Sequence, residues 1–251
     1  MNAYVELHCH SNFSFLDGAS HPWELVRRAA DLEMPALALT DTGGVYGAVR
    51  FLQSCQAFGV RPLLGAALGV DGEEIVLLAK TLRGWSNLCR LLSLAHRDQP
   101  KGEARTTLDM AAQHRGDVFH LTGTRDERTL RTIQEALGRD AVFLELHNHL
   151  RAEDPWLVAV QSELGARCQA PTVVTNDVRY HDRDRRPLHD VLTAIRNRAT
   201  LEEIHGQLPP NSEQVLKAGD ELRPLFPGRE DARTSELAQE CTPSLPWQFY
   251  P

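Results

Sequence analysis

The chain has 251 residues, of which 42% are hydrophobic, and this is enough apolar material for one large α/β domain with an appendage. Its formal net charge of −7 argues against a broad nucleic-acid-binding face, because such faces are usually basic. No apolar stretch reaches the roughly 20 residues of a membrane-spanning helix, and the N-terminus lacks the layout of a signal peptide, so we expect no membrane contact and a cytoplasmic protein.

Seven short, β-rich apolar runs recur along the chain and predict strands. They lie at residues 4–9, 35–41, 61–70, 74–80, 117–123, 141–147 and 171–177. Helical patterns separate most of them, at 21–33, 46–59, 85–97, 130–138 and 156–168. Because strands alternate with helices and no run is an obvious edge strand, we predict a closed seven-stranded (β/α) barrel of parallel strands. An open, doubly wound sheet is the alternative.

The pattern changes after residue 180. Residues 187–204 and 230–241 have the spacing of amphipathic helices, residues 213–226 can also be helical, and the Pro-rich end has no regular period. We therefore divide the chain into a barrel at 1–185 and a helical extension at 186–251. Trp247, Phe249 and Tyr250 near the end are typical of an interface.

Polar side chains follow the predicted strands at the ends where a barrel of this kind carries its chemistry. They are His8, His10, Asp41, Thr42, Thr122, Thr124, Glu145, His147, His149, Asn176 and Asp177. His8 and His10 point to one side, because residues two apart on a strand share a face. Asp17 and Asp177 lie just past predicted strands and can reach the same rim. Imidazole and carboxylate groups are ligands for Zn, Mn or Fe, and two such ions can activate water against a phosphoester.

At these residues the chain resembles the PHP (polymerase and histidinol phosphatase) domain that opens bacterial C-family DNA polymerases. The likeness is closest to the error-prone paralogue of the DNA polymerase III α-subunit. It is carried by ELHCHSNFSFLDGA, ALALTDTGGVYGAV, VRPLLGAALGV, GWSNLCRLLSLAH, VFLELHNH and TNDVRYHDRDRRPLHDVLTAIR, which together cover nearly the whole chain. The resemblance implies a distorted seven-stranded (β/α) barrel, followed by an extension that leads toward a polymerase palm that we expect this chain to lack.

The resemblance also implies which residues bind metal. Carried over position by position, it keeps His8, His10, Asp17 and Asp177 as ligands, with His149 and Glu74 in reserve. The family's other ligand positions are altered: Thr42 replaces a histidine, Ala67 a shared glutamate, Glu74 a histidine, Thr124 a cysteine or histidine, and Arg179 a histidine. A full trinuclear cluster is therefore not expected.

Two of these replacements have clear physical consequences. Ala67 offers no lone pair, so a metal cluster loses the anion that would hold its cations together. Arg179 stays protonated and cannot bind a metal, but it can pair with Asp17 or Asp177. The resemblance thus implies a degenerate site with room for one Zn or Mn ion on His8, His10 and Asp177.

Three functions stay open. The first is the PHP module of an error-prone polymerase α-subunit, which acts mainly as a scaffold for the polymerase core in DNA replication or translesion repair. Such a module contacts DNA only indirectly and does not polymerise nucleotides in isolation. The second is a metal-dependent phosphoesterase, of the histidinol phosphatase kind or a 3′–5′ exonuclease, against which Ala67 and Arg179 argue. The third is a module that binds an anion through Arg179.

Overall fold

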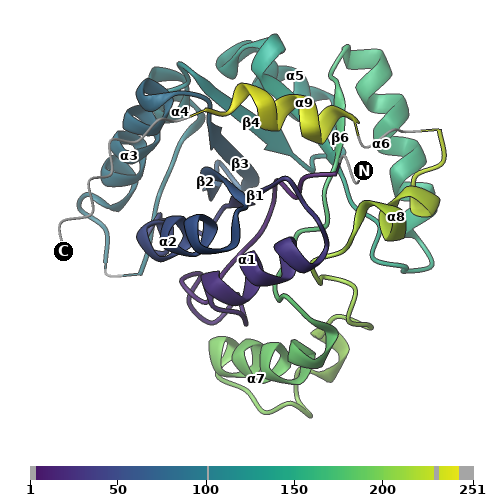
Figure 1. Cartoon of the computed structure of the whole chain (residues 1–251). Coiled ribbons are helices and arrows are strands. Elements are labelled where there is room, and N and C mark those ends of the chain that lie inside the picture. The colour runs from purple at the N-terminus through teal and green to yellow at the C-terminus, as the bar shows by residue number, and fades with distance from the viewer. Residues whose placement is uncertain (1–3, 101, 229–231, 243–251) are drawn as a thin grey trace.

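The computed structural model describes residues 4–100, 102–228 and 232–242, which form an α/β fold around one curled sheet (Figure 1). The six strands of the described residues are β1 (Ala36–Leu39), β2 (Arg61–Val70), β3 (Glu73–Ala79), β4 (Val118–Thr122), β5 (Val142–Leu146) and β6 (Thr172–Val174), paired in that order. The helices that flank the sheet are α1 (Pro22–Asp31), α2 (Ala48–Phe58), α3 (Leu82–His96), α4 (Leu108–Gln113), α5 (Glu127–Leu137) and α6 (Asp154–Cys168). None of the described helices is both long and apolar enough to cross a bilayer.

The first predicted strand, residues 4–9, is not a regular strand. It forms only isolated parallel bridges, from Glu6 to Leu37 of β1 and from Cys9 to Val178 beyond β6. The run therefore lies between the two edges of the sheet and hydrogen-bonds to both, through Ala38 N to Glu6 O at 2.9 Å and Val178 N to His8 O at 2.9 Å. The α/β class is confirmed, whereas the seven-stranded barrel is not, because the described sheet has six strands.

The orientation of β3 also differs from the predicted parallel sheet. β3 is antiparallel to both β2 and β4, while the other neighbouring pairs are parallel. Asp71 and Gly72 connect β2 to β3, and their φ angles are 48° and 93°. A two-residue Asp-Gly turn with positive φ at both positions joins antiparallel strands, because its twist matches theirs.

The extension after residue 185 contains α7 (Arg186–Asn197), α8 (Gly219–Leu222) and α9 (Ala232–Glu240). The predicted helix at 213–226 forms only in its second half, as α8 and the 3-10 turn Arg223–Leu225, since Val215 instead forms a bridge to Tyr180. The predicted helix at 187–204 stops early, where Arg198 takes a left-handed φ of 53°. The terminal residues Trp247, Phe249 and Tyr250 lie outside the described part of the chain.

α9 completes the core inside the curled sheet. Its residues Leu237 and Ala238, with Cys241 just after it, are buried in the same apolar cluster as strand residues such as Leu63 and Phe119. Arg61, the first residue of β2, donates hydrogen bonds from Nη1 to the carbonyls of Ala238 at 2.7 Å and Cys241 at 3.1 Å. α9 therefore closes the end of the sheet where the parallel strands begin (Figure 1). The division of the chain at 185/186 stays a prediction.

Candidate metal centre

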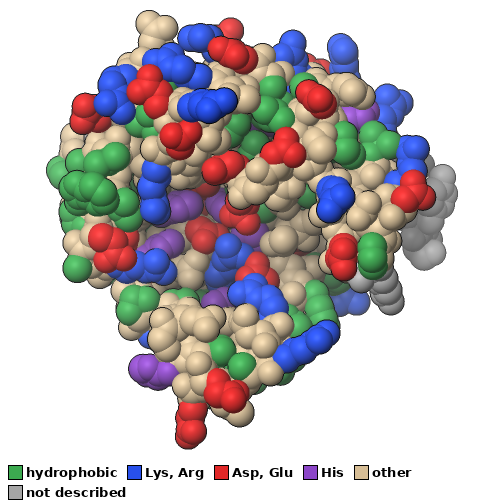
Figure 2. All heavy atoms as spheres, turned by 180° about the vertical axis from the view of Figure 1, so that it is seen from behind, with side chains coloured by type: hydrophobic (Ala, Val, Ile, Leu, Met, Phe, Trp, Pro, Cys, Tyr) green, Lys and Arg blue, Asp and Glu red, His purple; other side chains and the backbone are tan. Residues whose placement is uncertain are grey.

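The polar strand ends form a hollow on the face opposite to that seen in Figure 1. Figure 2 shows histidine side chains gathered there with acidic and basic side chains around them. His8 lies on the run 4–9 and His10 directly follows it, and Asp177 lies on the segment after β6. The φ angle of Asp177 is 43°, so the chain bends sharply at this residue.

Three donor atoms of the predicted ligands face one point. His8 Nε2 lies 2.9 Å from His10 Nε2, and each of these nitrogens lies 3.5 Å from Asp177 Oδ1. In a tetrahedral zinc site with bonds of about 2.0–2.1 Å, neighbouring donor atoms are about 3.3 Å apart. The three atoms are therefore spaced as one face of such a site, and the residues fit a single ion.

Glu145 on β5 holds the His8 ring in the orientation that this fit requires. His8 Nδ1 donates to Glu145 Oε1 at 2.9 Å, so that Nε2 faces His10 and Asp177. The same carboxylate oxygen accepts a hydrogen bond of 2.5 Å from Thr175 and lies 3.3 Å from His147 Nε2. A carboxylate behind a ligand histidine fixes its tautomer and increases its basicity. His8, Glu145 and His147 also form a second group with metal-ligating spacing, which shares the His8 ring with the first group.

Arg179 lies between the two acidic residues of the predicted site. Its guanidinium donates to Asp17 through Nη1, and its Nη2 lies 2.7 Å from Asp177 Oδ1. The other oxygen of Asp17 accepts a hydrogen bond of 2.6 Å from Arg196 on α7. Both carboxylates thus have positively charged partners, and Asp17 is directed to arginines instead of toward His8.

Nearby charges and burial shift the pKa values of His8 and His10 in opposite directions. Burial lowers the pKa of His8, but the negative charges of Glu145 and Asp177 outweigh burial and raise the pKa to about 9. For His10, burial and the Arg179 guanidinium together lower the pKa to about 4. Burial alone would raise the pKa of Asp177, but Arg179 and His8 hold this pKa well below its usual range. His10 is thus a neutral nitrogen donor, whereas His8 has to lose a proton before it binds a metal.

The remaining predicted positions divide into near and distant ones. Thr42 Oγ1 lies 3.2 Å from His10 Nδ1 and donates to Asp17 Oδ2 at 3.4 Å, so the hydroxyl contacts two of the candidate ligands. The Glu74 carboxylate is half exposed, 3.8 Å from His8 Nε2. His149 is directed elsewhere, since its Nε2 donates to the Asn176 carbonyl at 2.9 Å.

Two other replacements, Ala67 and Thr124, differ in their surroundings. Ala67 is buried in the apolar cluster inside the sheet. Thr124 accepts a hydrogen bond from Asp126 N at 3.4 Å in the loop before α5. Neither side chain belongs to a described group with metal-ligating spacing.

Sequence reasoning placed Glu145 and His147 on the rim without assigning either of them as a ligand or as a partner of His8, and it did not assign Arg196, which the structure also brings to the centre. Glu145 and His147 share a face near the end of β5, as His8 and His10 do on the first run, and this spacing was a usable signal. No sequence signal pointed to Arg196, because it lies 179 positions from Asp17 in the chain and reaches it only through the placement of α7.

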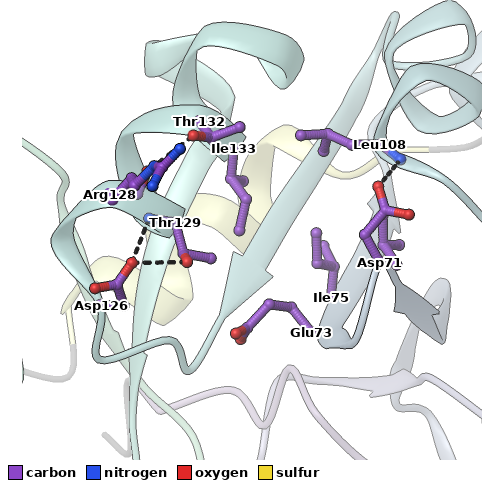
Figure 3. Close-up of a pocket in the computed structure, with 10 residues that line it drawn as sticks. Asp71, Glu73, Ile75, Leu108, Asp126, Arg128, Thr129, Thr132 and Ile133 are labelled. Carbon is purple, nitrogen blue, oxygen red and sulfur yellow. Dashed lines mark hydrogen bonds between the residues drawn. The ribbon is translucent and has the colours of Figure 1, made fainter.

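A separate cavity of about 460 Å³ lies outside the centre, between β3 and α5 (Figure 3). Ile75 and Ile133 face each other across it, while Asp126 is occupied in capping α5 by accepting from Thr129 N at 2.8 Å. None of the residues that line the cavity is a predicted ligand. The cavity is therefore distinct from the metal centre.

An α/β sheet with a histidine and aspartate centre at its strand ends defines the class of PHP-like domains. The family described as "PHP domain" matches residues 6–149, and the chain belongs to this family.

The chain is also similar to curated proteins that are much longer than it is. The chain is 37% identical over 256 residues to an error-prone DNA polymerase of Anaeromyxobacter sp. (strain K), and 36% identical over 268 residues to one of Ralstonia nicotianae. These matches cover 95% and 96% of this chain but only 22% and 25% of the relatives, so the chain spans about a quarter of their length.

A solved structure shares the fold at low sequence identity. It is an amidohydrolase from Chromobacterium violaceum, described as having bound sulfate and no metal. The TM-score is 0.51 at 18% identity, over 70% of this chain and 87% of that one. This likeness concerns the fold alone.

Proposed function

We propose that this chain is the PHP region of a bacterial error-prone DNA polymerase, with a degenerate metal centre and a mainly structural role beside the polymerase core in DNA replication or translesion repair. The observation that carries the proposal is the position of Arg179, whose guanidinium contacts both Asp17 and Asp177. A fixed cation neutralises the carboxylates that a second metal ion would need. Position 67 is an alanine, so it supplies no further carboxylate for a second ion.

The centre keeps the donors for one ion of Zn or Mn. His8 and His10 would supply Nε2 atoms and Asp177 would supply Oδ1, while Glu145 holds His8 in place. A divalent ion bound there supplies a Lewis acid for water or a phosphate oxygen. The residues of the chain bind and orient that ion, but the described residues present no second cluster that is independent of His8.

The proposed partner is the polymerase core, the part of the longer relatives that this chain does not match. Residues 1–185 would form the PHP region and residues 186–251 the extension toward that core. The chain would contact DNA only through the assembly, which agrees with its net charge of −7.

Metal content tests the degenerate centre. Protein purified without chelators is expected to hold no more than one equivalent of metal by mass spectrometry, and the double variant His8→Ala, His10→Ala is expected to hold none. A matched control, His205→Ala, changes an exposed histidine that belongs to neither donor group and should keep the wild-type content. Two or more tightly held equivalents in the wild type would contradict the proposal.

Association tests the structural role. The chain is mixed with the separately produced polymerase core of the Anaeromyxobacter relative, and complex formation is followed by sedimentation velocity. We expect a one-to-one complex. If no complex forms, and the core is equally stable and active without the chain, the structural role is wrong.

A metal-dependent phosphoesterase is the second candidate. It is favoured by the two donor groups, His8 with His10 and Asp177, and His8 with Glu145 and His147, which meet at one imidazole. Metal-stimulated release of phosphate or nucleotides, lost in the double histidine variant, would favour this candidate over the first. An anion-binding module receives no support from the geometry, because Arg179 already contacts two carboxylates.

A further inference from the structure

Helix α7 carries its apolar residues on the outside of the molecule. Leu188, Val191 and Ile195, here called the α7 stripe, are spaced by three and four residues and are 41%, 41% and 55% exposed. The residues that α7 buries are His189, Thr193 and Ala194, which are polar or small. A surface helix of a globular protein normally has the opposite arrangement, with its apolar face toward the core. The stripe therefore has the character of an uncovered contact face.

The protein holds α7 in a defined orientation without using the stripe. The His189 ring lies 5.6 Å from the Tyr180 ring, and Leu192 packs on the apolar cluster around Tyr180. Arg196 anchors the C-terminal half of the helix to Asp17 of the metal centre at 2.6 Å. Figure 1 shows α7 beyond α1, at the lower end of the molecule, away from the sheet. The stripe is thus presented outward by a helix whose other side is fixed.

The charges around the stripe favour a protein partner over a nucleic acid. Four arginines on or just before α7 are paired within the chain: Arg183 with Glu213 and Glu221, Arg185 with Glu24, Arg186 with Asp190, and Arg196 with Asp17. Binding to phosphates draws on arginines that are free to neutralise them. Here these four positive charges already have carboxylate partners, so an apolar protein groove is the better match to the stripe.

The size of the stripe favours a partner with a larger contact surface over a second copy of the chain that pairs through the stripe alone. A stable complex buries about 800 Å² on each partner, which three half-exposed aliphatic side chains do not provide by themselves. The stripe is therefore one part of a larger contact, as a polymerase core beside the chain would make. The match to the Anaeromyxobacter polymerase covers 95% of this chain, α7 included, and only 22% of that polymerase.

We infer that the α7 stripe is the surface that docks into an apolar groove of the polymerase core, an inference that rests on the proposed structural role. The anchor between Arg196 and Asp17 places this docking helix on the rim of the metal centre. The centre that Arg179 occupies and the docking helix are therefore directly connected through Asp17.

The test compares three forms of this chain: wild type, the stripe variant Val191→Glu, Ile195→Glu, and the control variant Val49→Glu, Leu82→Glu. The control changes residues of similar exposure, 45% and 47%, on α2 and α3. Each form is titrated calorimetrically into the part of the Anaeromyxobacter polymerase that lies outside the matched region. Circular dichroism and sedimentation velocity of each form alone verify the fold and the oligomeric state.

We expect the wild type and the control to bind alike and the stripe variant to bind at least tenfold more weakly. Equal binding by all three forms overturns the inference about α7 while leaving the structural role intact. Absence of binding by the wild type overturns both. Self-association of the wild type that the stripe variant loses also overturns the inference, because the occupant is then a second copy.

Discussion

Nη2 of Arg179 lies 2.7 Å from Oδ1 of Asp177, the oxygen that lies 3.5 Å from Nε2 of His8 and of His10. A guanidinium and a metal ion therefore compete for one carboxylate oxygen. Two like charges about 4 Å apart repel by about 4 kcal/mol at an effective dielectric constant of about 20, so the arginine opposes any cation bound beside it. This competition is the physical basis for proposing a degenerate centre.

Replacing Arg179 should improve metal binding. We expect Arg179→Gln to raise the affinity for Zn or Mn at least tenfold, about 1.4 kcal/mol, because the variant frees Asp177 Oδ1 and removes the positive charge. Isothermal titration calorimetry measures the change. Arg183→Gln, which removes a guanidinium paired with Glu213 and Glu221, is the matched control. An affinity that falls or stays the same in Arg179→Gln would show that the arginine does not occupy the ion's place.

Metal affinity should rise with pH. The pKa of His8 is raised to about 9 and that of His10 is lowered to about 4, so near neutral pH only His8 has a proton to lose on binding. One displaced proton gives a tenfold gain in affinity for each pH unit between about 6 and 8. Titrations in buffers of different ionisation enthalpy count the proton directly. An affinity that is constant over this range would contradict the assignment of His8 as a ligand.

His120 should make the fold less stable in mild acid. This side chain is fully buried on β4, and burial lowers its pKa to about 4. Between pH 6.5 and 4 the His120 ring is protonated in the unfolded chain but neutral in the folded chain. The free energy of unfolding therefore falls as the pH falls. The contribution lost between pH 7 and 5 is about 2 kcal/mol.

The measurement is denaturant unfolding of the wild type and of His120→Leu at both pH values. The variant should lose about 2 kcal/mol less than the wild type on going from pH 7 to pH 5. His205→Gln, at an exposed histidine, should behave as the wild type does. Parallel losses in all three proteins would mean that His120 does not titrate differently in the folded state.

The extension should be needed for the stability of the sheet. Leu237 of α9 is buried in the apolar cluster inside the sheet, so Leu237→Ala should lower the free energy of unfolding by about 2–5 kcal/mol. Leu188→Ala, on the exposed stripe of α7, should change it by less than about 0.5 kcal/mol. Urea unfolding compares the two leucines. Similar small effects would mean that α9 is a loosely attached segment.

Local signals in the sequence identified the strands and the first metal ligands. Apolar runs marked β1 to β6, and the spacing of His8 and His10 marked two donors on one face, because alternation along a strand is a local property. The same kind of local signal was available in Asp71-Gly72, which specifies the β2–β3 hairpin, but it was not used. Glu145 and His147 were placed on the rim, but their contact with His8 was not predicted. The PHP resemblance identified Asp17, Asp177 and the altered position Arg179.

Only the tertiary structure decided which of these residues meet and which charges cancel. It put Glu145 behind His8, directed Asp17 toward Arg179 and Arg196, and left the stripe of α7 outside while α9 entered the core. These contacts join segments up to about 180 positions apart, such as Asp17 and Arg196. Periodicity reports which face of an element is apolar, but the partner of that face is fixed by the packing of the whole chain. For this reason the sequence by itself indicated the family and the candidate donor types, and the fold determined which of those donors lie together.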